Sequence, residues 1–103
     1  MLIALDIGNT NITIGVFQDK TLKASWRLNT DTHRLPDEYA VTLINLFDIK
    51  KIDKEAINSA VICSVVPPLT VIFEEVFKSY FSIDPLVVSS GTKTGVKILY
   101  DSP

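Results

Sequence analysis

The residues with the clearest chemical potential lie in one short segment near the start of the chain, residues 6–11, with the sequence DIGNTN. Asp6 supplies a carboxylate of the kind that holds hydrated Mg²⁺ against phosphates. Gly8 and the asparagines tolerate a left-handed backbone, so the segment can turn tightly. Backbone N–H groups in such a turn can line a concavity that holds an anion, and Thr10 adds a hydroxyl. Because residues 2–19 contain no Lys or Arg, a metal ion and backbone dipoles would have to supply the positive charge.

The same segment also has a purely structural interpretation. Gly-Asn between two apolar runs is a hairpin signal, and an aspartate beside it can simply satisfy turn amides. A Walker-type loop is excluded, because that loop requires Gly-Lys-Ser/Thr. The number of polar side chains in so short a turn favours the phosphate site, and the plain hairpin remains the alternative.

Three strands are expected to position this turn. Apolar residues 2–7 predict a central strand buried on both faces. Residues 12–17 predict a second strand, in which Gly15 marks a bulge or a close backbone approach. After a turn at residues 18–21, the alternation in residues 22–29 predicts a half-exposed antiparallel strand. Its apolar face is expected to carry Leu22, Ala24, Trp26 and Leu28.

Helices and strands alternate in the rest of the chain. A helix is expected from Pro36, a residue favoured at the first helical position, although Leu35 before it lacks a capping side chain. A strand over residues 57–66, a second helix from Pro67 and a short buried strand over residues 85–88 follow. Consecutive hairpins followed by crossover helices indicate an α/β fold, with one mixed sheet and helices packed on it.

Composition restricts the classes of function. The 103 residues fit one domain, and a 47% hydrophobic content with a mean hydropathy of +0.27 fits a filled core. The net charge of -2 argues against nucleic acid as the main partner. No run approaches the roughly 18 apolar residues of a membrane helix, and the first residues lack the basic region of a signal peptide. We therefore expect a cytoplasmic protein with no membrane partner.

Other features have weaker functional interpretations. Cys63 is interpreted as a small core residue in a reducing compartment and not as a reactive thiol. His33, the only histidine, is interpreted as a plain surface residue. Residues 89–92 could cradle an anion, but small polar loops are common. Residues 95–100 are expected to form a further short strand.

Four segments together resemble the type III pantothenate kinases, which share the actin-like superfold of acetate kinases, sugar kinases, heat-shock ATPases and actin. Residues 6–11 resemble that family's phosphate loop, and residues 36–39 (PDEY) resemble the start of its first helix. Residues 64–67 (SVVP) resemble the element after its fourth strand, and residues 100–103 (YDSP) resemble its Tyr-x-x-Pro element. The resemblance implies an actin-like (ribonuclease H-like) ATPase domain with a mixed five-stranded sheet of order 3-2-1-4-5.

The resemblance also implies a reaction, the transfer of the γ-phosphate of ATP to pantothenate. The product is 4′-phosphopantothenate, at the first step of coenzyme A biosynthesis. It further implies Mg²⁺ with ATP, a monovalent cation (K⁺ or NH₄⁺) and a homodimer. Asp6 would contact the Mg²⁺–phosphate cluster, and Tyr100 would lie beside pantothenate. The residues expected around the phosphates are Asp6, Ile7, Gly8, Asn9, Thr10, Asn11, Ile12 and Thr13.

The family's catalytic base is an Asp in a Gly-x-Asp-Arg loop, expected just after Pro103. Residues 1–103 are therefore expected to be the N-terminal domain of a longer kinase and to be inactive alone. Two alternatives remain open. One is another actin-like phosphotransferase, although many sugar kinases carry Asp-x-Gly-Gly-Thr where this chain has Asn9. The other is a non-catalytic accessory factor for transcription, for which the sequence offers no basic patch or DNA-reading helix.

Overall fold

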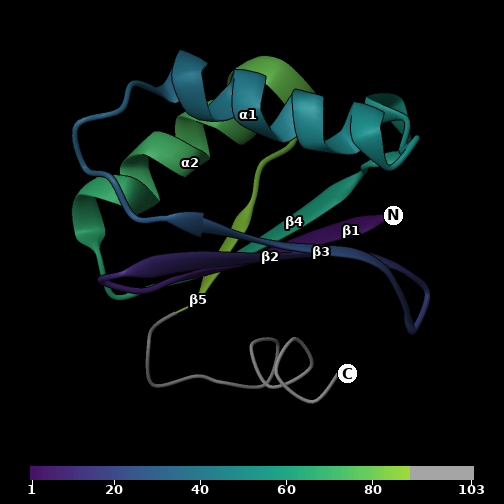
Figure 1. Cartoon of the computed structure of the whole chain (residues 1–103), viewed down its shortest axis with the longest axis horizontal. Coiled ribbons are helices and arrows are strands. Elements are labelled where there is room, and N and C mark those ends of the chain that lie inside the picture. Colours follow the sequence, from purple (N-terminus) through teal and green to yellow (C-terminus); the bar gives the residue numbers. More distant parts are fainter. Residues whose placement is uncertain (89–103) are drawn as a thin grey trace.

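Five strands form one mixed sheet in the computed structural model, which describes residues 1–88 (Figure 1). The strands are β1 (Leu2–Ile7), β2 (Asn11–Gln18), β3 (Thr21–Asn29), β4 (Ser59–Ser64) and β5 (Leu86–Val88). The helices are α1 (Pro36–Ile49), α2 (Pro67–Phe81) and the short 3-10 helix η1 (Lys54–Ala56). The sheet order is β3-β2-β1-β4-β5, which confirms the order implied by the resemblance. The strand predicted over residues 95–100 lies outside the described residues.

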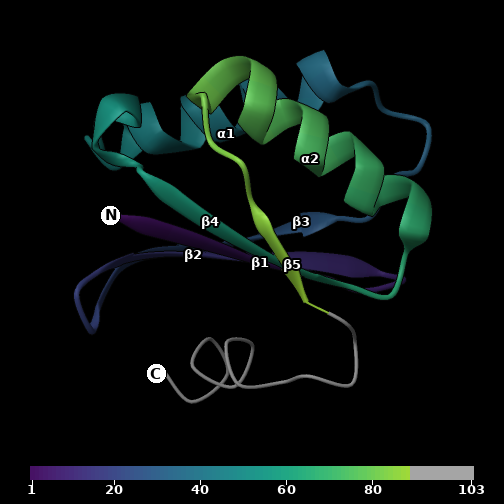
Figure 2. The same ribbon diagram turned by 180° about the vertical axis from the view of Figure 1, so that it is seen from behind.

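Strand β1 occupies the centre of the sheet. It pairs antiparallel with β2 and parallel with β4, while β3 and β5 continue the sheet on either side. Both α1 and α2 lie over the same face of the sheet, as two opposite views show (Figures 1 and 2). None of the helices within residues 1–88 has both the length and the apolar composition needed to cross a membrane.

The main core fills the space between this face and the two helices. From β1 and β2 it contains Ile3, Leu5, Ile7, Ile12, Ile14 and Val16. From the helices it contains Tyr39, Ala40, Leu43, Phe47, Leu69, Phe73, Val76 and Phe77. The helical residues recur every three or four positions, as expected for the apolar face of an amphipathic helix. Burying each large apolar side chain contributes about 1.5–3 kcal/mol, so this layer fixes the sheet against the helices.

A smaller apolar cluster lies on the opposite face of the sheet. It consists of Leu2, Ala4, Phe17 and Leu22. The prediction that Leu22 shares a face with Ala24 is therefore wrong, and a β-bulge is the reason. Val16 pairs with Ala24, but the next residue, Phe17, pairs with Leu22, which leaves Lys23 as an extra residue on β3. Because side chains alternate along a strand, one extra residue moves Leu22 to the other face.

Strands β5 and β4 also differ from the sequence prediction. The strand over residues 85–88 was expected to be buried, but Leu86 is 61% exposed and Val87 is 42% exposed. The physical reason is its position, since within residues 1–88 β5 is an edge strand that pairs only with β4. Strand β4 is also shorter than the predicted 57–66.

The start of α1 is capped despite the apolar residue before it. The N–H of Leu35 donates to Oε1 of Glu38 at 2.9 Å, so the side chain in the first turn satisfies a donor just outside the helix. Asp37 and Glu38 both lie in this first turn, at the positive end of the helix dipole. The missing capping side chain at Leu35 is thus partly compensated.

Candidate phosphate-binding site

The turn between β1 and β2 lies at the carboxyl end of β1, where ligands usually bind in open α/β sheets. The N–H of Gly8 donates to the Asn11 carbonyl at 2.9 Å and closes the turn. The N–H of Val65 donates to the Ile7 carbonyl at 3.0 Å, so the segment that follows β4 also holds the turn. The phosphate-loop and SVVP motifs, which are far apart in the sequence, therefore meet in space.

The backbone of this turn does not adopt the left-handed conformation that its composition suggested. Within residues 1–88, positive φ angles occur only at Asp19, Lys51 and Ser82. Gly8 is needed for space instead, because a Cβ at this position would lie 3.3 Å from the Asn11 carbonyl oxygen. That contact is tighter than an ordinary van der Waals contact, so any side chain here would displace the turn.

Two carbonyl groups of the turn are held by one residue that the sequence analysis did not single out. Thr30 donates from its N–H to the Thr10 carbonyl at 2.9 Å and from its hydroxyl to the Gly8 carbonyl at 2.7 Å. Within the described part of the chain, the N–H groups of Asn9 and Thr10 donate to no acceptor. The side chains of residues 9–11 are exposed. An exposed turn with unbonded N–H groups is a typical anion-binding arrangement.

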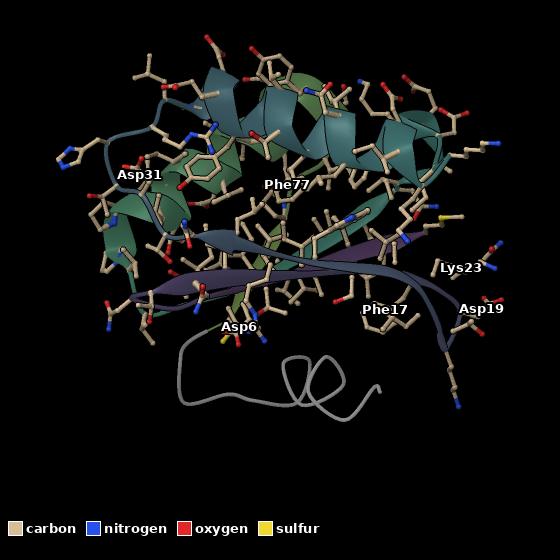
Figure 3. All side chains as sticks on the ribbon, viewed as in Figure 1. Asp6, Phe17, Asp19, Lys23, Asp31 and Phe77 are labelled. Carbon is tan, nitrogen blue, oxygen red and sulfur yellow. The ribbon has the colours of Figure 1, made fainter. Side chains whose placement is uncertain are left out.

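Asp6 lies close to the end of β1 and is half-buried. It lies on the sheet face opposite the helices, the same face as Phe17, whereas Phe77 lies on the helix side (Figure 3). Its neighbours by register are Thr13 on β2 and Cys63 on β4. The carboxylate is therefore placed beside the turn by the central strand, which is paired on both sides.

A positively charged residue of β3 lies in the same cross-strand row as Asp6, although the sequence analysis gave it no role. Thr13, the register partner of Asp6, pairs on its other side with Arg27 of β3. Directly opposed residues share a face of the sheet, and neighbouring strands lie about 4.8 Å apart. Arg27, Thr13 and Asp6 thus form one polar row across three strands. Only the strand register reveals this, because Arg27 lies outside the segment that carries the phosphate motif.

The carboxylate of Asp6 suits a metal ion shared with a ligand better than a metal ion held by protein side chains alone. Across the described residues, no group of three or more His, Cys, Asp or Glu side chains could hold a metal ion. Mg²⁺ usually keeps several waters and is bound through one or two carboxylates together with substrate phosphates. A single carboxylate beside a turn with unbonded N–H groups, as at Asp6, fits Mg²⁺ that arrives with a nucleotide better than a metal cage made by the protein alone.

The remaining predicted site residues divide into two groups. The side chains of Ile7 and Ile12 are fully buried in the main core, so these residues could contact phosphate only through their backbone. Tyr100 and the small polar loop at residues 89–92 lie outside the described residues. Of the residues given little functional weight, Cys63 is buried as predicted, and His33 lies in the exposed β3–α1 loop.

Helix α2 begins next to the turn but contributes few donors to it. Pro67 and Pro68 lack an N–H group, and the N–H groups of Leu69 and Thr70 both donate to the Val66 carbonyl. The usual anion-binding capacity of a helix N-terminus is therefore largely absent here. Among the described elements, the β1–β2 turn is the better candidate for binding a phosphate.

Comparison with known proteins gives a consistent family match. The family model for type III pantothenate kinase matches residues 2–103. A type III pantothenate kinase from Dehalococcoides mccartyi is 51% identical over 102 residues, which are 99% of this chain and 40% of that protein. One from a Roseiflexus species is 50% identical over 103 residues, with 100% and 40% coverage. One from Halalkalibacterium halodurans is 44% identical, with 100% and 41% coverage. The chain thus spans about 40% of the length of these curated relatives.

Solved structures give an independent view of the fold. A proposed N-acetylglucosamine kinase from Porphyromonas gingivalis aligns with a TM-score of 0.61 at 13% identity, covering 86% of this chain and 34% of that one. A ROK hexokinase from Thermus thermophilus aligns with a TM-score of 0.61 at 16% identity, covering 85% and 34%. At such low identity the likeness concerns the fold alone, and it identifies the fold as that of the actin-like kinases.

Proposed function

The chain belongs to the type III pantothenate kinase family, and on that premise we propose that the full-length protein transfers the γ-phosphate of ATP to pantothenate. The product would be 4′-phosphopantothenate, which starts coenzyme A biosynthesis. The observation that carries the proposal is the β1–β2 turn, whose Asn9 and Thr10 N–H groups have no acceptor in the described part of the chain and which directly follows the strand that carries Asp6.

Phosphoryl transfer depends mainly on positioning and on stabilising negative charge, and the residues of the turn suit both tasks. The N–H groups of Asn9 and Thr10 would donate to phosphate oxygens, and the Thr10 hydroxyl and the Asn11 side-chain amide would add donors. Asp6 would hold the hydrated Mg²⁺ that accompanies ATP, and this ion would neutralise phosphate charge. Arg27, in the same cross-strand row, would add a fixed positive charge.

Other parts of the proposal come from family membership alone. They are a monovalent cation (K⁺ or NH₄⁺), a homodimer, a cytoplasmic location, and a second domain that completes the nucleotide site.

Tyr100 would line the pantothenate pocket, and its replacement should raise the KM for pantothenate more than that for ATP. An equal rise in both KM values would contradict this role.

The experiment that tests the proposal uses the purified full-length protein with Mg²⁺-ATP, a monovalent cation and pantothenate. We expect ADP release together with phosphopantothenate identified by mass spectrometry. Glucose and N-acetylglucosamine serve as alternative acceptors, because sugar kinases share the fold. Phosphorylation of a sugar without phosphorylation of pantothenate would overturn the proposed acceptor while keeping the phosphate site. If the protein neither hydrolyses ATP nor transfers its phosphate to any acceptor, the proposed reaction is overturned.

A further inference from the structure

The β1–β2 turn lacks one of the two hydrogen bonds that usually close a hairpin. In an ordinary hydrogen-bonded pair, the two residues exchange both N–H···O bonds. Here the Gly8 N–H donates to the Asn11 carbonyl, but within residues 1–88 the reciprocal bond from the Asn11 N–H to the Gly8 carbonyl is absent. The Gly8 carbonyl accepts from the Thr30 hydroxyl at 2.7 Å instead. Thr30 therefore takes the place of the missing hairpin donor.

This exchange determines where the next N–H group points. The Gly8 carbonyl and the Asn9 N–H belong to the same planar trans peptide, so they point in opposite directions. When Thr30 draws the carbonyl toward the β3–α1 loop, the Asn9 N–H faces away from that loop. If the carbonyl turned back to the Asn11 N–H, the Asn9 N–H would rotate with it and leave the position in which it can meet a phosphate.

Thr30 is itself held in place by a buried tyrosine of α1. The next residue, Asp31, donates its N–H to the Tyr39 hydroxyl at 3.2 Å, and that hydroxyl donates to the Asp31 carbonyl at 2.8 Å. Tyr39 is fully buried, with its ring centroid 4.7 Å from that of Phe73 on α2 and the Arg34 guanidinium 5.0 Å from its ring centroid. Asp31 lies on the loop that leads from β3 to α1 (Figure 3). A continuous set of contacts thus runs from the helix layer to the turn.

We propose that Thr30 and Tyr39 are positioning residues that orient the Gly8–Asn9 peptide toward the nucleotide phosphates. The inference deepens the proposed phosphate site and rests on it, but it does not depend on which acceptor is phosphorylated. The Thr30 hydroxyl fixes the peptide directly. The Tyr39 hydroxyl fixes the backbone that carries Thr30, so its effect should have the same direction and be smaller.

The test uses the full-length protein and measures the affinity for Mg²⁺-ADP and for adenosine, which has no phosphate. Thr30→Val keeps the size of the side chain and the N–H bond to Thr10 but removes the hydroxyl. It should weaken ADP binding about 5- to 10-fold and leave adenosine binding within about 2-fold, as expected for the loss of one hydrogen bond that orients a phosphate donor. Thr30→Ser retains a hydroxyl and should restore ADP affinity. Tyr39→Phe should weaken ADP binding about 2- to 4-fold.

Two matched controls remove comparable hydroxyls elsewhere. Thr70→Val removes a hydroxyl that donates to the carbonyl of Val66, the residue that caps the start of α2, and Tyr80→Phe removes one that donates to Asp37. Both should leave the ratio of ADP to adenosine affinity unchanged.

The outcomes separate the positioning role from a purely structural one. A lower melting temperature for Thr30→Val with an unchanged ratio of ADP to adenosine affinity would overturn the inference. If Thr30→Val does not fold, Tyr39→Phe decides by the same ratio. Selective loss of ADP affinity in a protein that does not phosphorylate pantothenate would support the positioning role and contradict only the proposed acceptor. A wild-type protein without affinity for ADP would overturn the phosphate site and this inference together.

Discussion

Strand β2 is bounded by two hairpin turns that are built in different ways. The β2–β3 turn consists of Asp19 and Lys20, and Asp19 adopts a φ of 55°, a left-handed conformation in which aspartate is enriched. Within residues 1–88, no hydrogen bond from outside the hairpin reaches these two residues. The β1–β2 turn has no left-handed residue and is held by Thr30 and Val65, which come from other parts of the chain.

The difference lies in what holds each turn in shape. The β2–β3 turn is shaped by a left-handed residue and by its own strand pairing, so it needs no contact from elsewhere. The β1–β2 turn has no left-handed residue and lacks the second closing bond, so contacts from elsewhere must hold its shape. The two turns lie at opposite ends of the sheet, with Asp19 and Lys23 near one end and Asp31 near the other (Figure 3). Matched substitutions can therefore test one end against the other.

The largest expected effect comes from removing the carboxylate next to the proposed phosphate-binding turn. Asp6→Asn in the full-length enzyme should lower kcat on the order of 10²-fold while keeping the fold, because it removes a charge that acts on the phosphates and not one that supports the core. Asp19→Asn is the matched change at the other turn and should leave kcat unchanged. Steady-state kinetics with saturating Mg²⁺-ATP, together with circular dichroism, provide the measurement. Near-normal kcat for Asp6→Asn would contradict the assigned role, and unfolding would favour a turn-capping aspartate.

Removing the glycine of the β1–β2 turn should impair ATP binding, whereas adding a glycine to the β2–β3 turn should not. Gly8→Ala introduces a Cβ 3.3 Å from the Asn11 carbonyl oxygen and should raise the KM for ATP about 10-fold by displacing the turn. Asp19→Gly relieves a left-handed non-glycine residue and should change stability by less than about 1 kcal/mol, with unchanged kinetics. Urea unfolding and ATP titrations would measure both effects. Equal kinetic responses at the two turns would show that the contrast drawn between them is wrong.

Two cations on β3 offer a finer comparison. Arg27 shares the polar row with Asp6 and Thr13, whereas Lys23 is the bulge residue near the β2–β3 turn. Arg27→Gln should raise the KM for ATP about 5-fold, because an exposed guanidinium contributes modestly to phosphate binding. Lys23→Gln should leave it unchanged. A similar rise in both variants would indicate a general electrostatic effect, and repeating the titration at high salt would reveal it.

The smallest expected effect concerns alkaline pH. Burial raises the pKa of the Tyr39 hydroxyl above 10.0, although the hydrogen bond from the Asp31 backbone opposes the shift. A raised pKa means that the folded state holds this proton more tightly than the unfolded state, so the stabilisation is complete below about pH 10 and is lost as pH rises through the folded-state pKa.

Thermal melts between pH 9 and 12 should therefore show a shallower decline for Tyr39→Phe than for wild type, with a difference of less than about 5 °C. Tyr80, whose pKa is raised mainly by its hydrogen bond to Asp37, keeps titrating in this variant, so the decline should not vanish. Asp19→Asn should follow the wild-type curve, because it leaves both tyrosines in place. A Tyr39→Phe curve parallel to wild type would contradict the role of this hydroxyl.

Most elements of the fold could be predicted from the sequence because their patterns are local. The apolar faces of α1 and α2 follow from residues spaced three and four apart, and the hairpin at Asp19 follows from turn composition. The strand order did not follow from these patterns and required the family resemblance. The sheet face predicted for Leu22 was wrong, because the alternation of side chains along one strand does not reveal an extra residue such as Lys23. Only the pairing of β3 with β2 shows that residue.

The candidate site was predictable only in part for a similar reason. Asp6 and the residues of the turn are adjacent in the sequence, so their types alone indicated a phosphate site. The register of β2 with β3 brings Thr30 to the turn and places Arg27 in the row with Asp6, and the parallel pairing of β1 with β4 brings Val65 to the turn. Sequence spacing does not contain this information. The hydrogen bond of the Tyr39 hydroxyl was not predicted, because the place of Tyr39 on the apolar face of α1 already explained an aromatic residue there.

The central position of β1 also has a consequence for the order in which the protein folds. Pairing with β2 closes a short loop, but pairing with β4 joins distant segments, as shown by the N-terminal amine of Met1, which donates to the Ala56 carbonyl 55 residues away. Closing long loops costs more entropy, and such pairs generally form late. We therefore expect the hairpin to form early and the bond from Val65 to Ile7 to form in the final cooperative step. During synthesis, one edge of β1 stays open until β4 has emerged, so the strand that carries Asp6 can mispair with another chain in that interval.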